Sequence, residues 1–276
     1  MLSKQIIIGS LALALVPTLN GCDTIKKSVN EFNTYSLADD LTLGKQTAAQ
    51  IASKPTEFPV LPEAQYPQAY AYLNQIKDNI LGSGKVRTAR VFPYELKIIK
   101  DDKTLNAFCT PGGYIYVYTG LIKFLDSEDQ LAGVLGHEIG HADKRHSTRQ
   151  LTKMMPLDMI AQVLTGTDKG PVTKETQQVI AQVAGTLIGL KFSRDHETEA
   201  DQASVDYLCG TQYHADGAAA FFQKIQGKGG TPPEFMSTHP DPKNRVAEIK
   251  KRKQQLNCSG NASNDTEYAR IKKTLP

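Results

Sequence analysis

Two histidines lie four residues apart in the segment LAGVLGHEIGHADKRH, residues 131–146, and a glutamate directly follows the first of them. On an α-helix, positions four apart are separated by about 40° around the axis and about 6 Å along it, so His137 and His141 could bind one metal ion. Glu138 would lie beside that ion, where a carboxylate can take a proton from a zinc-bound water and later donate it to a leaving amine. Catalytic zinc sites have three protein ligands and leave the fourth position to water. The segment therefore predicts part of a zinc site that needs one more ligand.

The segment SRDHETEAD, residues 193–201, supplies a third ligand about 56 residues after the second histidine. Glu197 and Asp201 are four residues apart and share one face of a helix, whereas Glu199 points about 200° away from Glu197. We expect the shared face to turn inward, so that Glu197 completes the ligand set. Asp201 would then hydrogen-bond the far nitrogen of a ligand histidine, for which His137 is our choice, and fix its tautomer.

Short metal-binding patterns also arise by chance, and a surface helix that merely carries histidines is the alternative for the first segment alone. The second segment, with its two inward carboxylates, makes that alternative much weaker. The other histidines, His146, His196 and His214, are assigned to solvent or to structure, and His146 in particular is expected to lie outside the site.

The composition is that of a globular protein with a sizeable core. The chain has 276 residues, of which 40% are hydrophobic and 22% charged, and its formal net charge is +3. So small a net charge gives no reason to expect a nucleic-acid partner, which needs concentrated basic charge. The one basic run, Lys250 to Lys253, falls on a predicted helix, where a solvated face is the simplest interpretation and contact with an anionic membrane is the alternative.

The N-terminus indicates export. A lysine is followed by an apolar segment, Ile6 to Val16, which is too short for a bilayer-spanning helix of about 20 residues but is typical of a signal peptide. Cys22 follows a small residue, as in a bacterial lipobox, although Asn20 is unusual two positions before the cysteine. We therefore predict a lipoprotein signal peptide over 1–21, lipidation of Cys22, a polar tether over 22–33, and anchoring in the bacterial periplasm to the inner or outer membrane. An ordinary signal peptide that is cut elsewhere is the alternative.

Without Cys22, an odd number of cysteines remains: Cys109, Cys209 and Cys258. In an exported chain, one disulfide and one free thiol are the simplest expectation. A Cys209–Cys258 bond would join the end of a helix to the C-terminal segment, although spacing alone does not fix the pairing, and three free thiols are the alternative. No two of these cysteines have the spacing of a metal site.

The elements that would position these residues are mostly helices, in which apolar residues recur every three or four positions. They are predicted over 37–51, 63–81, 173–190, 193–208 and 216–225, over a charged segment ending near 256, and after Ser127. Ser127 and Gln130 form a predicted capping box at the start of the helix that carries HEIGH. Residues 166–171 and 227–242 are expected to be breaks or loops, and residues 257–276 a loosely ordered polar tail.

Three shorter runs predict a small sheet. They cover 94–100, 105–109 and 114–118, and Pro111-Gly112-Gly113 between the last two predicts an antiparallel hairpin. The predicted fold class is therefore α+β and predominantly helical, with a small three-stranded sheet beside the helix that carries HEIGH. A single zinc-binding domain is expected over 34–256.

HEIGH and ETEAD, together with NAFCTPGGYIYVYTGL before them and STHPDPKNR after them, resemble peptidase family M48. The resemblance runs from about Thr104 to Arg245. This family of gluzincin metallopeptidases includes the CAAX prenyl proteases, the HtpX heat-shock proteases, the mitochondrial OMA protease and periplasmic lipoprotein proteases of bacteria. Because no membrane-spanning segment is predicted, the chain is most similar to the lipoprotein branch. The resemblance implies a gluzincin metalloprotease core with one zinc ion per chain.

The resemblance implies the same zinc ligands as the spacing, namely His137, His141 and Glu197, with Glu138 as the general base. The resemblance also assigns roles to residues about which the spacing argument says nothing. These residues lie in one predicted strand and in the segment around His239-Pro240.

Asn106, Ala107 and Phe108 correspond to an edge strand above the zinc, to which an extended peptide substrate would add by backbone pairing. A plain core strand is the alternative for these residues. His239 resembles a residue that reaches into the site, either to stabilise the tetrahedral oxyanion or to act as an inhibitory fourth zinc ligand. A loop histidine without a role is the alternative there. Arg245 would anchor that loop, in one interpretation on an active-site carboxylate.

These residues predict a zinc metalloendopeptidase that cleaves unfolded, misfolded or mislocalised cell-envelope proteins, by attack of zinc-bound water on a peptide carbonyl with Glu138 as base. An envelope chaperone or peptide-binding lipoprotein that uses the same groove with little proteolysis is the first alternative, and a zinc hydrolase of a non-peptide substrate is the second. Glu138 disfavours the first, because binding alone needs no base. The predicted edge strand disfavours the second. The expected partners are polypeptide substrates and, through the lipid anchor, a membrane.

Overall fold

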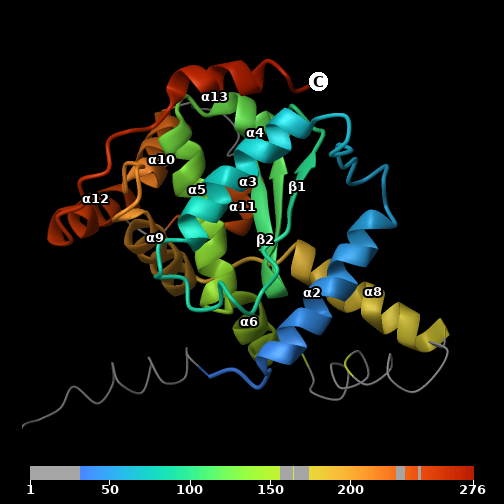
Figure 1. Cartoon of the computed structure of the whole chain (residues 1–276). Coiled ribbons are helices and arrows are strands. Elements are labelled where there is room, and N and C mark those ends of the chain that lie inside the picture. The colour runs from blue at the N-terminus through green and yellow to red at the C-terminus, as the bar shows by residue number, and fades with distance from the viewer. Residues whose placement is uncertain (1–31, 156–163, 165–173, 228–233, 242–243) are drawn as a thin grey trace, which may run out of the picture. The chain divides into compact units, whose positions relative to one another are not determined.

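Helix α5 (Glu128–Asp143) carries HEIGH through the interior of the fold, as Figure 1 shows for the computed structural model. All 16 of its residues are buried, the polar ones included. Ser127 caps the helix by accepting a hydrogen bond from the backbone N–H of Gln130, as the sequence pattern predicted, but the Gln130 side chain reaches back to Asp126 instead of Ser127. The structure describes residues 32–155, 164, 174–227, 234–241 and 244–276.

Three short strands form one sheet with the order β1-β3-β2. They are β1 (Leu96–Ile99), β2 (Ala107–Thr110) and β3 (Tyr114–Tyr118). β2 and β3 are antiparallel and joined by the turn η1 (Pro111–Gly113), so the predicted hairpin is confirmed. Gly112 and Gly113 adopt φ angles of 74° and 84° there, a conformation that favours glycine. β1 runs parallel to β3, which makes the sheet mixed and leaves β2 at an edge.

Both faces of the sheet are covered by apolar side chains. One face packs in the main core with α5 and α3 (Pro67–Leu81). Its contribution consists of Leu96, Ile98, Ala107, Cys109, Ile115 and Val117. The other face packs with Ile51 of α2 (Leu37–Ala52) in a smaller cluster, to which it contributes Ile99, Phe108 and Tyr116. Each strand therefore alternates between two apolar layers, and the position of β2 is fixed on both faces.

Helix α9 (Arg194–Leu208) packs closely along α5. Small residues on α5 allow this approach. A Cβ atom added at Gly140 would lie 3.2 Å from the carbonyl oxygen of Ala200, and one added at Gly136 would lie 2.7 Å from Oγ of Ser204. These distances are shorter than ordinary van der Waals contact, so a larger residue at either position would push the two helices apart. The glycines of α5 thus bring the carboxylates of α9 up to HEIGH.

The other described helices are α4 (Thr119–Phe124), α6 (His146–Met154), α8 (Lys174–Ile188), α10 (Gly217–Gly227), α11 (Glu234–Thr238), α12 (Arg245–Gln255) and α13 (Asp265–Lys272). Helices α2, α3, α5, α8, α9, α10 and α12 confirm predicted ones, although α3 starts later than expected, with Pro67 at its first position. α6 lies inside the helical stretch predicted from Ser127 to the break at 166–171, but it is separate from α5. α4 and α11 were not predicted, because helices of 6 and 5 residues are too short to show a clear period. α11 lies in the segment that was expected to be a loop.

The C-terminal segment is not the loosely ordered tail expected over 257–276. Helix α13 buries Tyr268 and Ile271, and Leu275 is buried just beyond it. The hydroxyl of Tyr268 donates a hydrogen bond to the carbonyl of Ile122, 2.6 Å away. Three apolar side chains at positions i, i+3 and i+7 are enough to attach this helix to the core. The prediction missed this pattern because it was based on the polar composition of the whole segment.

The disulfide Cys209–Cys258 is present, and Cys109 is a buried free thiol, as the simplest interpretation of the cysteine count predicted. The bond joins the end of α9 to the segment that follows α12. Residues 33–276 form one compact unit. Among the described residues, no helix is both long and apolar enough to cross a membrane. The predicted signal peptide with Cys22, most of the predicted tether and the predicted break over 166–171 lie outside the described residues.

Candidate metal centre

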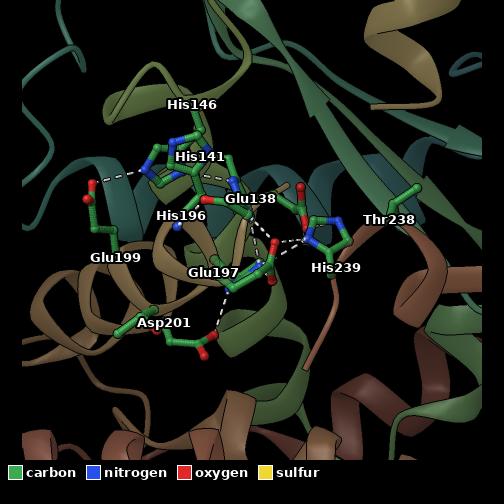
Figure 2. A network of polar contacts seen from close by, with 12 residues as sticks. Glu138, His141, His146, His196, Glu197, Glu199, Asp201, Thr238 and His239 are labelled. Atoms are coloured by element: carbon green, nitrogen blue, oxygen red, sulfur yellow. Dashed lines mark hydrogen bonds and ion pairs between the residues drawn. The ribbon is translucent and has the colours of Figure 1, made fainter. Parts of the chain in front are cut away.

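The three residues predicted as ligands lie together in the interior, and Figure 2 shows two of them, His141 and Glu197. The Nε2 atoms of His137 and His141 are 3.0 Å apart on α5. Across from them on α9, Oε2 of Glu197 is 3.3 Å from Nε2 of His137, and Oε1 is 3.5 Å from Nε2 of His141. The two histidines, on successive turns of α5, and the carboxylate of Glu197 therefore direct their donor atoms at a common point.

His239 brings a fourth donor atom to the same point, from the residue directly after α11. Its Nδ1 is 3.3 Å from Nε2 of His137 and 3.1 Å from Oε1 of Glu197. One donor atom from each of the four side chains lies within 4.8 Å of all the others. The ring of Phe235 stacks on His239 at 4.2 Å between centroids, and Phe192 stacks on His141 at 3.9 Å. Aromatic side chains thus cover the cluster.

The distances within the cluster fit a zinc ion. In a tetrahedral site with bonds of about 2.0 to 2.1 Å, two ligand atoms lie about 3.3 Å apart. Five separations join Nε2 of His137, Nε2 of His141, Nδ1 of His239 and the two oxygens of Glu197, and they range from 3.0 to 3.5 Å. A shared proton could satisfy only one pair of these atoms, whereas a single divalent cation satisfies all of them. Imidazole nitrogen and carboxylate oxygen are also donors that zinc accepts.

Glu138 lies next to the cluster and has no hydrogen-bond partner for either carboxylate oxygen among the described residues. Its Oε1 is 3.6 Å from Nε2 of His239, a buried nitrogen that has no hydrogen-bond partner among the described residues. Burial raises the pKa of the Glu138 carboxyl above its ordinary value. A raised pKa suits a group that must accept and release a proton near neutral pH.

Behind His137, Asp201 and Arg245 form a buried extension of the cluster. Oδ1 of Asp201 is 2.9 Å from Nδ1 of His137, which places the carboxylate where the helix spacing predicted it. Arg245 donates to both oxygens of Asp201, over 2.7 and 3.0 Å, and to Oε2 of Glu197 over 3.3 Å. Its guanidinium also stacks on the ring of Phe222 at 3.4 Å. Arg245, which follows the segment that carries His239, is therefore held against the carboxylates of Asp201 and Glu197.

The charges of the cluster are strongly coupled. Burial opposes the charged form of His137, but the hydrogen bonds that its ring donates to Asp201 and Glu197 raise its pKa to about 9. Burial likewise opposes ionisation of Glu197, but His239 and His137 hold its pKa well below the usual range. Burial and the neighbouring histidines lower the pKa of His141 well below its ordinary value. A proton on His137 compensates the two carboxylates, and a bound cation would take over that role.

His146 lies closer to the site than the sequence led us to expect, although it is not one of the four clustered side chains. Its ring is fully buried, and its Nδ1 is 2.9 Å from Nδ1 of His141 (Figure 2). α5 ends at Asp143, and Arg145 takes a left-handed conformation with φ of 58°, so α6 starts in a new direction that returns the ring of His146 to His141. A spacing argument restricted to one helix cannot foresee such a turn.

His196 and His214 are not part of the cluster. His196 is buried and stacks on His146 with 4.4 Å between ring centroids, so its role is structural. Burial, with His146 nearby, lowers its pKa to about 3. The side chain of His214 is 45% exposed near Asp129.

The predicted substrate strand lies at the free edge of the sheet. The backbone N–H of Tyr118 donates to the carbonyl of Asn106. After Asn106, every second residue of the strand therefore directs its backbone N–H and C=O groups toward β3. In such an antiparallel pair Phe108 also faces β3, whereas Ala107 and Cys109 turn their backbone groups toward the open edge. The side chains of the predicted strand are buried, and Phe108 stacks on Tyr116 at 4.9 Å.

A buried cluster of two histidines from one helix and a glutamate from another, with a second buried glutamate beside it, defines a metallopeptidase type of site. Residues 67–253, more than half of the chain, match the model of peptidase family M48, and the chain belongs to this family. The match begins before Thr104, the start of the resemblance seen in the sequence.

The chain is similar to several proteases of known name. It is 25% identical over 258 residues to the beta-barrel assembly-enhancing protease of Escherichia coli (strain K12), an alignment that covers 88% of this chain and 50% of that protein. It is 25% identical over 252 residues to the metalloprotease LoiP of the same strain, which covers 88% and 94%. It is 32% identical over 153 residues to the mitochondrial metalloendopeptidase OMA1 of Arabidopsis thaliana, which covers 54% and 29%. The chain spans half or less of the assembly-enhancing proteases of Escherichia coli and Yersinia pestis, but almost the whole of LoiP.

Proposed function

We propose that this protein is a zinc-dependent metalloendopeptidase that cleaves unfolded, misfolded or mislocalised proteins of the bacterial cell envelope. The observation that carries the proposal is the position of Glu138, a fully buried carboxylate that lies directly beside a four-residue cluster suited to a metal ion. Membership of the peptidase family and the protease names of the relatives support it.

His137, His141 and Glu197 would hold one zinc ion, because their donor atoms have the separations of tetrahedral ligands. When bound, zinc would polarise the peptide carbonyl and lower the pKa of water at the site. Asp201 holds the ring of His137 in place through the hydrogen bond to Nδ1 and keeps its proton on that nitrogen, so that Nε2 offers a lone pair.

Glu138 would move the proton of the reaction. Its carboxylate takes a proton from the attacking water and later donates that proton to the leaving amine, so the base is regenerated in each cycle. The raised pKa of Glu138 suits both steps, because the protonated form must persist long enough to act as an acid.

The outer edge of β2, which pairs with no other described strand, supports an extended polypeptide as substrate. Backbone groups of Ala107 and Cys109 face that edge and could pair with a peptide lying along it, next to Glu138 on α5. Edge pairing requires several consecutive residues in an extended conformation, which favours unfolded chains over folded ones. The name of the assembly-enhancing proteases supports an envelope substrate, and lipidation at Cys22 would place the enzyme in the periplasm on the inner or outer membrane.

His239 is proposed to be an inhibitory fourth ligand in the conformation described here. Its Nδ1 faces His137 and Glu197, the same point that the other donors face. All four ligand side chains are fully buried, and the backbone N–H of Phe235 donates to the carbonyl of Leu105 beside the open edge. A peptide could reach Glu138 only after the segment of α11 and His239 moves away.

The burial of the site is also the observation that favours the alternative, an envelope chaperone or peptide-binding lipoprotein with little proteolysis. The two functions are separated by cleavage of unfolded casein. Wild-type protein should degrade casein, and Glu138→Gln should abolish the cleavage while it keeps the bound zinc, because the amide cannot accept the proton. Undiminished cleavage by Glu138→Gln would exclude the proposed mechanism, and zinc-loaded wild type that binds casein without cleaving it would favour the alternative.

A further inference from the structure

The two histidines on α5 differ in what supports them from behind. His137 meets a carboxylate directly, through Asp201. His141 turns its Nε2 toward His137 and Glu197, and its outer nitrogen, Nδ1, meets another imidazole, Nδ1 of His146, at 2.9 Å. An imidazole in this position calls for a partner of its own, because it must accept a hydrogen bond at one nitrogen and donate one at the other.

That partner is Glu199. Nε2 of His146 is 3.2 Å from Oε2 of Glu199 (Figure 2), and Arg149 donates to the same oxygen over 2.9 Å. His146 and Arg149 are buried on α6, and Glu199 is partly buried on α9. A continuous row of polar contacts therefore leads from His141 through His146 and Glu199 to Arg149.

We propose that His146, supported by Glu199 and Arg149, is a positioning residue that fixes the ring orientation and the tautomer of His141 as a metal ligand. The inference rests on the proposed function, since it requires His141 to bind zinc. It goes beyond the ligand set by giving a role to a histidine five positions after His141, on a different helix.

Only one arrangement of protons satisfies every contact in the row. A ligand nitrogen must offer its lone pair, so His141 carries its proton on Nδ1 and donates it to His146. Nδ1 of His146 is then an acceptor, and its own proton lies on Nε2, where it is donated to Glu199. The negative charge of Glu199 favours this tautomer of His146, and Arg149 holds the carboxylate in place.

Each of the two ligand histidines is thus supported by a carboxylate, directly for His137 and through one further imidazole for His141. Helix α9 supplies both carboxylates, and each carboxylate is held by an arginine: Asp201 by Arg245 and Glu199 by Arg149. For His137 the carboxylate is in direct contact, whereas for His141 the ring of His146 spans the distance. Loss of that ring should leave His141 free to rotate or to adopt the wrong tautomer.

His196 provides a matched control. Its ring stacks on His146 with centroids 4.4 Å apart and planes 11° apart, and it is buried in the same place. Neither of its ring nitrogens has a hydrogen-bond partner among the described residues. His196→Phe therefore removes a buried imidazole without removing a hydrogen bond, whereas His146→Phe removes both contacts of the row.

The test measures zinc affinity by competition with a chelating dye, on metal-free full-length protein whose folding is checked by thermal unfolding. His146→Phe should weaken zinc binding by about 10- to 100-fold, the usual effect of losing an outer partner of a ligand. His146→Asn should recover most of that loss, because its Oδ1 can accept from Nδ1 of His141 where the imidazole nitrogen did. His196→Phe should bind zinc as wild type does. The absorption spectrum of bound Co²⁺ should change in His146→Phe and stay unchanged in His196→Phe.

Several results would overturn the inference. It fails if folded His146→Phe binds zinc as tightly as wild type, or if His196→Phe and His146→Phe weaken binding equally, since packing alone would then explain the loss. If His146→Phe does not fold, Glu199→Gln replaces it, and unchanged zinc affinity in that variant contradicts the inference. Wild-type protein that binds no zinc would refute the proposed function as well, whereas tight binding by wild type and by every variant refutes only the role of His146.

Discussion

Arg245→Met is expected to destabilise the protein far more than Arg252→Met, although both arginines form a two-bond ion pair with an aspartate. Both lie on α12, and each donates two hydrogen bonds to an aspartate of α9. Arg245 binds Asp201 over 2.7 and 3.0 Å, and Arg252 binds Asp206 over 2.7 and 2.9 Å. The pairs differ in burial: the side chains of the first are 0% and 5% exposed, and those of the second 34% and 35%.

Burial sets the magnitude of each effect. Removing one partner of a buried ion pair leaves a charge without compensation and costs about 3–5 kcal/mol. Arg245 faces two carboxylates, because Glu197 also accepts from it, so its loss should fall in the upper part of that range. The exposed pair of Arg252 is solvated and screened, and its loss should cost less than about 1 kcal/mol.

The free energies of unfolding should be measured by urea denaturation of wild type and both variants in excess chelator, so that bound metal does not contribute. The expected difference between the variants is at least about 2 kcal/mol. If Arg245→Met does not fold at all, Arg245→Lys, which keeps one charge but loses the planar pair of donors, should give an intermediate loss. Equal losses for Arg245→Met and Arg252→Met would refute the reasoning that burial makes the Arg245 pair a determinant of the site.

Three further predictions concern the loop histidine, the disulfide and the C-terminal helix. His239→Ala should increase casein cleavage if Nδ1 of His239 blocks the zinc, as its contacts with His137 and Glu197 indicate; decreased cleavage at unchanged zinc content would instead assign it to stabilising the oxyanion. Replacing both Cys209 and Cys258 by serine should lower the free energy of unfolding by up to about 4 kcal/mol, from the entropy of a loop of 49 residues, and urea midpoints equal to those of wild type would contradict this. Tyr268→Ala should cost about 3–5 kcal/mol and Tyr268→Phe only about 1 kcal/mol, measured by urea denaturation, because the first empties a buried site and the second removes one hydrogen bond; equal small losses would mean that α13 does not pack as described.

The parts of the site that sequence could predict are those fixed by helix geometry. The positions of His137 and His141 on one face of α5, and of Glu197 and Asp201 on one face of α9, follow from the number of residues per turn. The hairpin of β2 and β3 follows from two glycines in a turn. Each of these features depends only on residues that are close together in the sequence.

The parts that sequence could not predict depend on how separate segments meet. His146 reaches His141 because the chain turns at Arg145, and nothing in the spacing of the histidines reports a left-handed residue. The side of the cluster on which His239 lies depends on α11, a helix of 5 residues in a segment rich in glycine and proline. The glycines of α5 were a usable signal, since Gly136 and Gly140 lie four apart on a buried helix and mark its contact with α9.

A crystallographic anomalous difference map at the zinc absorption edge tests the central claim most directly. The map of crystals of the purified wild-type protein should contain one strong peak per chain, bound by Nε2 of His137, Nε2 of His141 and a carboxylate oxygen of Glu197 at about 2.0 to 2.2 Å. Glu138 should lie close to the peak without binding it. A peak at another set of side chains, or no peak in crystals of protein that cleaves casein in the presence of chelator, would contradict the proposed zinc site.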